Sequence, residues 1–220
     1  MMILKFVTSI AASRGIIVWM TFILSTLWIS SCRDAPSEPD PSPSSSDTTE
    51  WLSHRHRMQS MNEGMPFRTE EDWDHHQNRS QPKRWKVKKQ RNPAYQTLAW
   101  HLFSMGSAYQ NYDFEMLSAV CYFSYQVNPE TGAYHTIHQW KSTSLVDSAR
   151  RHGTEVYLSV SNFGAKANAT FLTRPHAWQT LADSLTQLLT ERNAYGVNID
   201  FEGVPGKYKM AFTHFIQRLS

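Results

Sequence analysis

The sequence predicts an α/β fold built on a parallel sheet, because short apolar runs alternate with amphipathic segments through its second half. Three of the runs are typical of buried strands: residues 116–125, 155–160 and 196–202. Three segments with apolar residues at helical spacing follow them in turn: residues 143–152, 175–191 and 208–219. Parallel strands need a long crossover connection, usually a helix, so this order favours a sheet covered by helices.

Local signals support each expected element. Residues 116–125 (MLSAVCYFSY) are almost continuously apolar or aromatic, as expected for a strand buried on both faces, and residues 128–132 (NPETG) supply a turn. The helix expected over 143–152 is followed by Gly153, the usual residue of a helix C-terminus. Pro175 stands where a first helical residue is expected for the next helix.

Residues 1–32 predict the compartment. Lys5 and Arg14 precede an apolar run over residues 15–31, and the run ends in Ile-Ser-Ser before Cys32. This ending resembles the lipobox of bacterial lipoproteins, which implies export, cleavage before Cys32 and lipidation of that cysteine. The resemblance places the protein in the bacterial cell envelope, anchored by lipid to the outer membrane or cell surface. The alternative is an uncleaved transmembrane anchor.

The segment between the signal and the globular part is polar. Residues 33–50 are rich in Pro, Ser and Asp and are expected to form a disordered tether. Residues 51–92 form a polar, partly ordered lead-in, and the basic run at 83–91 is interpreted as a solvated spacer, not a nucleic-acid site. The histidines of the lead-in lack the spacing and cysteine partners of a structural zinc site. We therefore expect no metal, no cofactor and no nucleic-acid partner.

Residues 93–220 carry the candidate chemistry on one strand. Along a strand side chains alternate between faces, so Asn198, Asp200 and Glu202 share one face of the strand expected at 196–202. In a β/α barrel one strand face meets the helices and the other faces the interior, with chemistry at the carboxyl ends. Glu202 comes last and would lie nearest that mouth. Two carboxylates this close favour holding one of them protonated, as a general acid requires.

Two segments resemble family 18 glycoside hydrolases. Residues 195–202 (YGVNIDFE) are similar to the strand motif Asp-Gly-x-x-x-Asp-x-Glu of that family, with Tyr195 in place of the first acid. A further acid of the motif is Asn198 here, which resembles the family members that act on bacterial cell-wall glycans. Residues 159–164 (SVSNFG) are similar to the Ser-x-Gly-Gly segment of the family, with Phe163 replacing the first glycine.

The resemblance implies a parallel (β/α)8 TIM barrel, a retaining mechanism and a set of roles. Glu202 would be the general acid and base, Asp200 would orient the 2-acetamido group of the substrate, and Asn198 would hydrogen-bond Asp200. The acetamido oxygen then takes the place of an enzyme nucleophile. The substrate implied is a glycan that contains N-acetylglucosamine: chitin, peptidoglycan or an N-glycan core.

Four further residues are candidates for substrate binding. Phe123 and Tyr125, at the end of the first expected strand, could stack on sugar rings, with a place in the core as the alternative. Ser161 and Asn162 come from the Ser-x-Gly-Gly-like segment. Asn168-Ala169-Thr170 matches the glycosylation sequon, which carries little weight in a bacterial lipoprotein.

The barrel is expected to be incomplete within this chain. A barrel of this kind takes about 250 residues, whereas residues 93–220 hold only about the first three β/α units by this interpretation. Two other classes of function stay open: a catalytically inactive, carbohydrate-binding surface lipoprotein, and a surface attachment protein that uses the barrel as a scaffold.

Overall fold

The computed structural model describes residues 53–78 and 94–220, together with the backbone of one strand at 17–20. The described residues belong to two compact units. The smaller unit contains helix α1 (His54–Asn62), and the larger contains strand β1 (Ile17–Met20) and residues 66–220. The candidate site lies in the larger unit.

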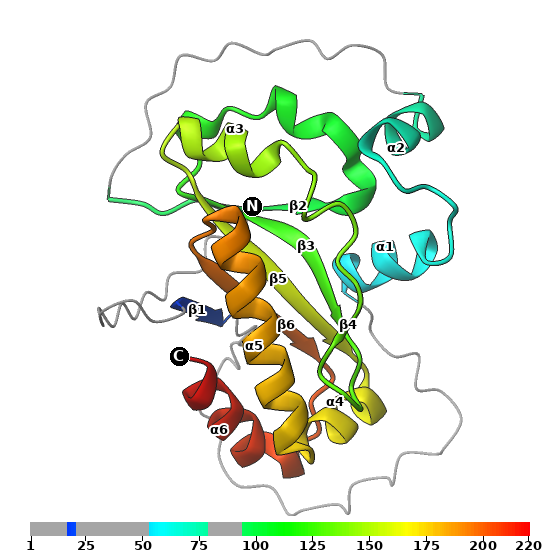
Figure 1. Cartoon of the computed structure of the whole chain (residues 1–220), viewed down its shortest axis with the longest axis vertical. Helices are drawn as coiled ribbons and strands as arrows, with labels where there is room; N and C mark the ends of the chain where they lie inside the picture. Colours follow the sequence, from blue (N-terminus) through cyan, green and yellow to red (C-terminus); the bar gives the residue numbers. More distant parts are fainter. Residues whose placement is uncertain (1–16, 21–52, 79–93) are drawn as a thin grey trace, which may run out of the picture. The chain divides into compact units, whose positions relative to one another are not determined.

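Strands and helices alternate along the larger unit (Figure 1). After β1, its strands are β2 (Leu98–Leu102), β3 (Ala119–Val127), β4 (Tyr134–Thr136), β5 (Glu155–Phe163) and β6 (Gly196–Glu202). Its α-helices are α2 (Glu70–His76), α3 (Leu145–Arg151), α4 (Ala165–Leu172), α5 (Pro175–Arg192) and α6 (Lys209–Leu219). Three 3-10 segments complete it: η1 (Phe103–Asn111), η2 (Phe114–Met116) and η3 (Gly206–Tyr208).

The sheet confirms the predicted parallel α/β fold. Its strand order is β1-β6-β5-β3-β2, all paired in parallel, and β4 pairs antiparallel with β3. From β2 through β3 and β5 to β6, neighbours in the sheet follow the order of the chain, as successive strands of a barrel do. The described part is therefore a partial barrel.

The structure contains strands beyond the three that were predicted, and β2 is one of them. Residues Leu98–Leu102 form β2, which pairs in parallel with β3 and precedes it in the chain. A histidine at the fourth of its five positions interrupts the apolar pattern by which a buried strand is recognised. His101 is nevertheless 1% exposed, and its Nδ1 atom lies 3.0 Å from the hydroxyl oxygen of Tyr112. The buried imidazole thus has a polar partner, which makes the position compatible with a strand core.

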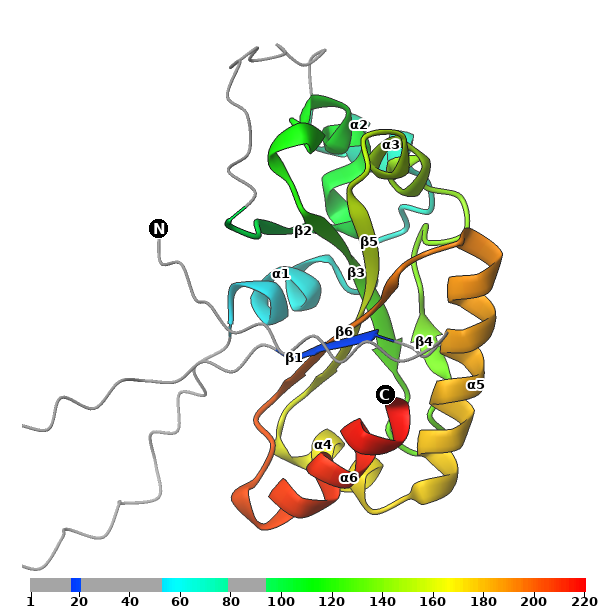
Figure 2. The same ribbon diagram turned by 90° about the vertical axis from the view of Figure 1, so that its left-hand side faces the viewer.

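Helices cover one face of the sheet. Figure 2 shows α5 lying along that face, with α4 and α6 grouped near the end of the molecule where β5 and β6 finish. Pro175 occupies the start of α5 as expected, and the helix ends at Asn193, which has the left-handed conformation with φ of 48°. The buried face of α5 includes Leu181, Leu185 and Leu188, so the predicted helical spacing is confirmed.

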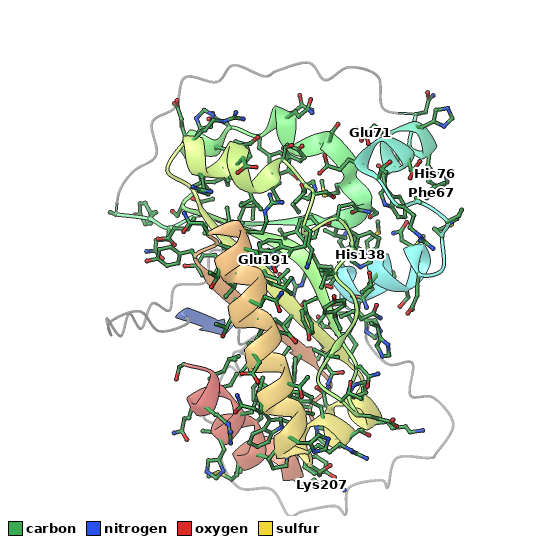
Figure 3. All side chains as sticks on the ribbon, viewed as in Figure 1. Phe67, Glu71, His76, His138, Glu191 and Lys207 are labelled. Carbon is green, nitrogen blue, oxygen red and sulfur yellow. The ribbon has the colours of Figure 1, made fainter. Side chains whose placement is uncertain are left out.

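Part of the expected lead-in is ordered within the larger unit. Helix α2 begins with a capping box in which the side chain of Thr69 accepts from the backbone of Asp72, and Asp72 returns the bond. Trp73 is only 2% exposed and packs edge-on against Phe103, with ring centroids 5.5 Å apart. Figure 3 shows Phe67 beside His76 at the same helix; their ring centroids are 4.6 Å apart. An aromatic cluster therefore fastens α2 to the start of η1.

A buried carboxyl group reinforces that attachment. Glu70 accepts hydrogen bonds from the hydroxyls of Tyr109, at 2.9 Å, and Thr143, at 2.5 Å. Burial raises the pKa of the Glu70 carboxyl, and the two hydroxyl donors oppose that shift. Thr143 lies just before α3, so this carboxyl group joins α2 to two later parts of the chain.

Within residues 1–52, the structure describes one strand, β1. Ile17–Met20, inside the segment expected to be a signal peptide, pair in parallel with β6 in the register Ile17 to Gly196 and Met20 to Ile199. Cys32 and the tether at 33–50 lie outside the described residues, so lipidation remains a prediction. No helix in the described ranges combines the length and apolar character needed to cross a membrane. Within those same ranges, no three His, Cys, Asp or Glu side chains gather as metal ligands.

Candidate active site

The candidate site lies where β5 and β6 end. These strands pair so that Ser159 lies opposite Asn198, Ser161 opposite Asp200, and Phe163 opposite Glu202. Register partners in a parallel sheet point to the same side, so the predicted acids and Ser161 share one sheet face. Two residues labelled in Figure 3 flank β6 in the chain. Glu191 lies near the end of α5, just before β6, and Lys207 lies in η3, just after it.

Asn198 is fully buried and joins three strands. Its Oδ1 atom accepts hydrogen bonds from Nε1 of Trp100 on β2 and from the hydroxyl of Ser159 on β5, each at 3.2 Å. Its Nδ2 atom has no hydrogen-bond partner in the structure, so the predicted bond from Asn198 to Asp200 is not formed. Trp100 and Ser159 were not predicted as site residues, because a strand pattern does not reveal which side chains meet across the interior.

Asp200 is 4% exposed, and the neighbouring strands β5 and β3 carry two serine hydroxyls beside it in the sheet. Ser161, its register partner, exchanges a hydrogen bond of 2.9 Å with the hydroxyl of Ser124 on β3. The register of β3 against β5 shifts between Phe123 and Tyr125, and the peptide bond between Phe123 and Ser124 is cis. Ser124 was not predicted as a site residue, because the apolar run at 116–125 contains no sign of this irregularity.

Glu202 ends β6 and is partly exposed. Its backbone carbonyl accepts two hydrogen bonds: from the N–H of Gly164, at 3.0 Å, and from Nδ2 of Asn168, at 2.6 Å. Gly203 follows with φ of 73°, so the chain turns sharply directly after the acid. The strand end that carries the predicted general acid is thereby tied to the start of α4.

The four predicted substrate-binding residues divide between the two faces. Ser161 lies on the same sheet face as Asp200. Phe123 is fully buried, and its ring stacks on that of Phe163 with ring centroids 6.3 Å apart. Tyr125 is fully buried on the helix side, where its hydroxyl donates to the carbonyl of Gly132 at 2.8 Å. Burial raises the pKa of Tyr125 to about 12. We therefore assign Tyr125 to the core and not to a sugar-binding surface.

Asn162 also lies away from the acids. It stands opposite Phe201 in the register of β5 and β6, and its Nδ2 atom donates to Oδ1 of Asn168 at 3.1 Å. Because adjacent residues of a strand point to opposite faces, Asn162 points toward the helices while Ser161 points toward Asp200. The structure thus gives Asn162 a contact with α4 in place of the predicted contact with substrate.

Solved structures with a similar fold are glycan-cleaving enzymes by their printed names. The spore cortex-lytic enzyme SleL of Bacillus cereus matches with a TM-score of 0.50 and 16% identity, over 56% of this chain and 30% of that one. A class V chitinase of Nicotiana tobaccum matches with a TM-score of 0.48 and 13% identity, over 56% of this chain and 37% of that one. A chitinase of Bacteroides thetaiotaomicron matches at 0.48 and 15%, over 57% and 42%. No protein-family model matches the sequence, and no curated protein matches it either.

The fold and the site together define a class: a partial parallel β/α barrel with two acids at the carboxyl end of one strand. More particularly, the likeness to SleL shows a family 18 glycoside hydrolase-like fold, as the motif at 195–202 predicted. The chain spans 30% of SleL, 37% of the Nicotiana chitinase and 42% of the Bacteroides chitinase.

Proposed function

We propose that this protein hydrolyses β-glycosidic bonds in glycans that contain N-acetylglucosamine. The observation that carries the proposal is the placement of Asp200 and Glu202 on one face at the carboxyl end of β6, where barrel enzymes hold their catalytic groups. The family 18-like fold supports glycan hydrolysis in general. The substrate, the mechanism and the role of each residue are parts of the proposal.

In the proposed mechanism Glu202 gives its proton to the glycosidic oxygen as the leaving sugar departs. The carbonyl oxygen of the substrate's 2-acetamido group attacks the anomeric carbon, and Asp200 orients that group and stabilises its developing positive charge. Water then opens the oxazolinium intermediate and returns a proton to Glu202, so the configuration at the anomeric carbon is retained. Asn198, held by Trp100 and Ser159, fixes the strand next to Asp200.

Two features favour a glycan of the bacterial cell wall. Asn198 stands where the family motif usually has an acid, as in the members that act on such glycans. SleL, a solved structure with a similar fold, is named a cortex-lytic enzyme. We further propose that lipid on Cys32 holds the exported protein at the cell envelope, where this polymer lies.

Substitution of the general acid tests the enzymatic proposal. Glu202→Gln removes a proton donor at nearly constant volume, and we expect hydrolysis of a chromogenic N-acetylglucosamine oligomer to fall about 10²–10⁴-fold, with unchanged glycan binding. Glu191→Gln is the matched control, since Glu191 is an exposed acid of α5. Hydrolysis within tenfold of the parent would contradict the role of Glu202.

The nature of the substrate gives a second test. An oligomer with a free 2-amino group at the cleaved sugar lacks the attacking oxygen, so we expect it to resist cleavage. Efficient cleavage would indicate an ordinary enzyme nucleophile. A parent protein that binds the acetylated oligomer without turnover would instead identify the inactive carbohydrate-binding lipoprotein.

The anchor is tested separately, by labelling cells with a fatty acid. We expect label in the parent and none in Cys32→Ser, whose precursor lacks the acceptor thiol. Equal labelling of both proteins would contradict lipidation at Cys32.

A further inference from the structure

The carbonyl group of Glu202 is held from outside its own strand. Both hydrogen bonds that it accepts come from the segment after β5: one from the backbone of Gly164 and one from the side chain of Asn168. A carbonyl oxygen has two lone pairs, so these two donors complete its hydrogen bonding. Figure 1 shows α4, which carries Asn168, beside the lower ends of β5 and β6.

Asn168 is itself fixed at every polar atom of its side chain. It is 0% exposed, and its Nδ2 atom donates to the carbonyls of Glu202, at 2.6 Å, and Gly164, at 3.0 Å. Its Oδ1 atom accepts from Nδ2 of Asn162 at 3.1 Å. Because two carbonyls need the NH₂ side and an amide donor needs the oxygen side, the orientation of this amide is fully determined.

From this geometry we propose that Asn168 is a positioning residue for Glu202. It contacts the backbone carbonyl of the acid and not its carboxyl group, so it acts by fixing the strand end from which the carboxyl group projects. That control matters most at this point, because Glu202 is the last residue of β6 and the sharp turn at Gly203 follows directly. The catalytic part of the inference rests on the proposed function.

The sequence alone offers an unrelated interpretation of the same residue. Asn168-Ala169-Thr170 matches the glycosylation sequon, but a fully buried amide with three hydrogen bonds is not available to accept a glycan. Its burial and bonding are accounted for by the contacts to the ends of β5 and β6.

The test compares two variants of α4 in the full 220-residue chain. Asn168→Ala removes the hydrogen bond to the Glu202 carbonyl, whereas Phe171→Leu loosens the same helix at a residue that packs against Phe201 and Phe215. Two readouts need no activity: hydrogen exchange at the Gly164 amide, which shares the carbonyl, and the ¹³C resonance of the Glu202 carboxyl group. We expect at least about tenfold faster exchange and a shifted resonance in Asn168→Ala, and neither in Phe171→Leu.

Kinetics on the N-acetylglucosamine oligomer form the second arm. We expect kcat of Asn168→Ala to fall about 10–100-fold with KM within about twofold, because a displaced acid affects the chemical step. If Asn168→Ala does not fold, Asn162→Ala removes only the bond that orients the amide and should give a smaller change of the same kind. Parent-like exchange and resonance in the Asn168 variant would overturn the positioning role. Because the barrel is expected to be incomplete in this chain, exchange and resonance decide the role of Asn168 whether or not the parent cleaves the oligomer, and cleavage itself tests the proposed function.

Discussion

The two faces of β6 show opposite solutions to burial. On the helix side, the ring of Phe201 lies 5.4 Å from that of Phe171 and 5.6 Å from that of Phe215. On the other side, Asn198 and Asp200 are 0% and 4% exposed. Apolar contact suffices for the first face, whereas the second requires hydrogen bonds that reach across β5 to β2. Apolar packing on the helix side thus holds β6 in place, and the opposite face carries the polar side chains of the candidate site.

The largest expected effect lies on the helix side. Phe215 is 1% exposed and contacts rings from α4, α5 and β6, so Phe215→Ala should lower the free energy of unfolding by about 3–5 kcal/mol. Urea denaturation measures the change. A loss below about 1 kcal/mol would show that α6 does not pack on the sheet as described.

The opposite pattern is expected for the polar side. Asp200→Asn keeps the shape of the side chain but removes the charge that we propose stabilises the acetamido group, so kcat should fall about 10²–10³-fold. The midpoint of urea denaturation should stay close to that of the parent. If stability falls and hydrolysis persists, Asp200 is a structural residue and the comparison of the two faces fails.

A smaller effect is expected at Asn198, which lies on the polar face of β6 but is fully buried and contributes to stability. Asn198→Ala leaves the donors of Trp100 and Ser159 without their acceptor, which should cost about 1–3 kcal/mol of stability. The same denaturation experiment on Ser159→Ala, which removes only one of the two bonds, provides the comparison. Equal stability of Asn198→Ala and the parent would contradict the cross-strand network.

The smallest effect separates a core residue from a substrate-binding one. Tyr125→Phe removes only the hydroxyl that bonds the Gly132 carbonyl, so stability should fall by about 1 kcal/mol. Binding of the N-acetylglucosamine oligomer, measured by calorimetry, should not change. Weaker binding in this variant would restore Tyr125 to the substrate site.

Elements with regular periodicity could be predicted from the sequence, and those fixed by polar contacts could not. The strand Gly196–Glu202 and the helix Pro175–Arg192 carry clear signals and were found. Strand β2 was missed because His101 interrupts it, and α2 because its buried Trp73 stands in a polar segment. Trp73 is the buried residue of α2, and one apolar position cannot reveal a helical period.

The same distinction applies to the site. The placement of Asp200 and Glu202 on one face of β6 could be predicted because their spacing along one strand is visible in the sequence. The face of the sheet on which Asn162 and Tyr125 lie could not be predicted. It depends on the irregular register of β3 and on the contacts of α4. Such contacts join residues far apart in the chain and leave no local pattern.

The pairing of β1 with β6 connects the predicted cleavage before Cys32 with one edge of the sheet. The four residues of β1 lie in the segment predicted to be removed before Cys32, so the precursor and the processed protein would present different neighbours to the Gly196–Ile199 edge of β6. Cleavage would expose the backbone N–H and C=O groups of that edge, which then become available to another strand. A signal segment that pairs in this way would shield the strand of the two acids until export is complete.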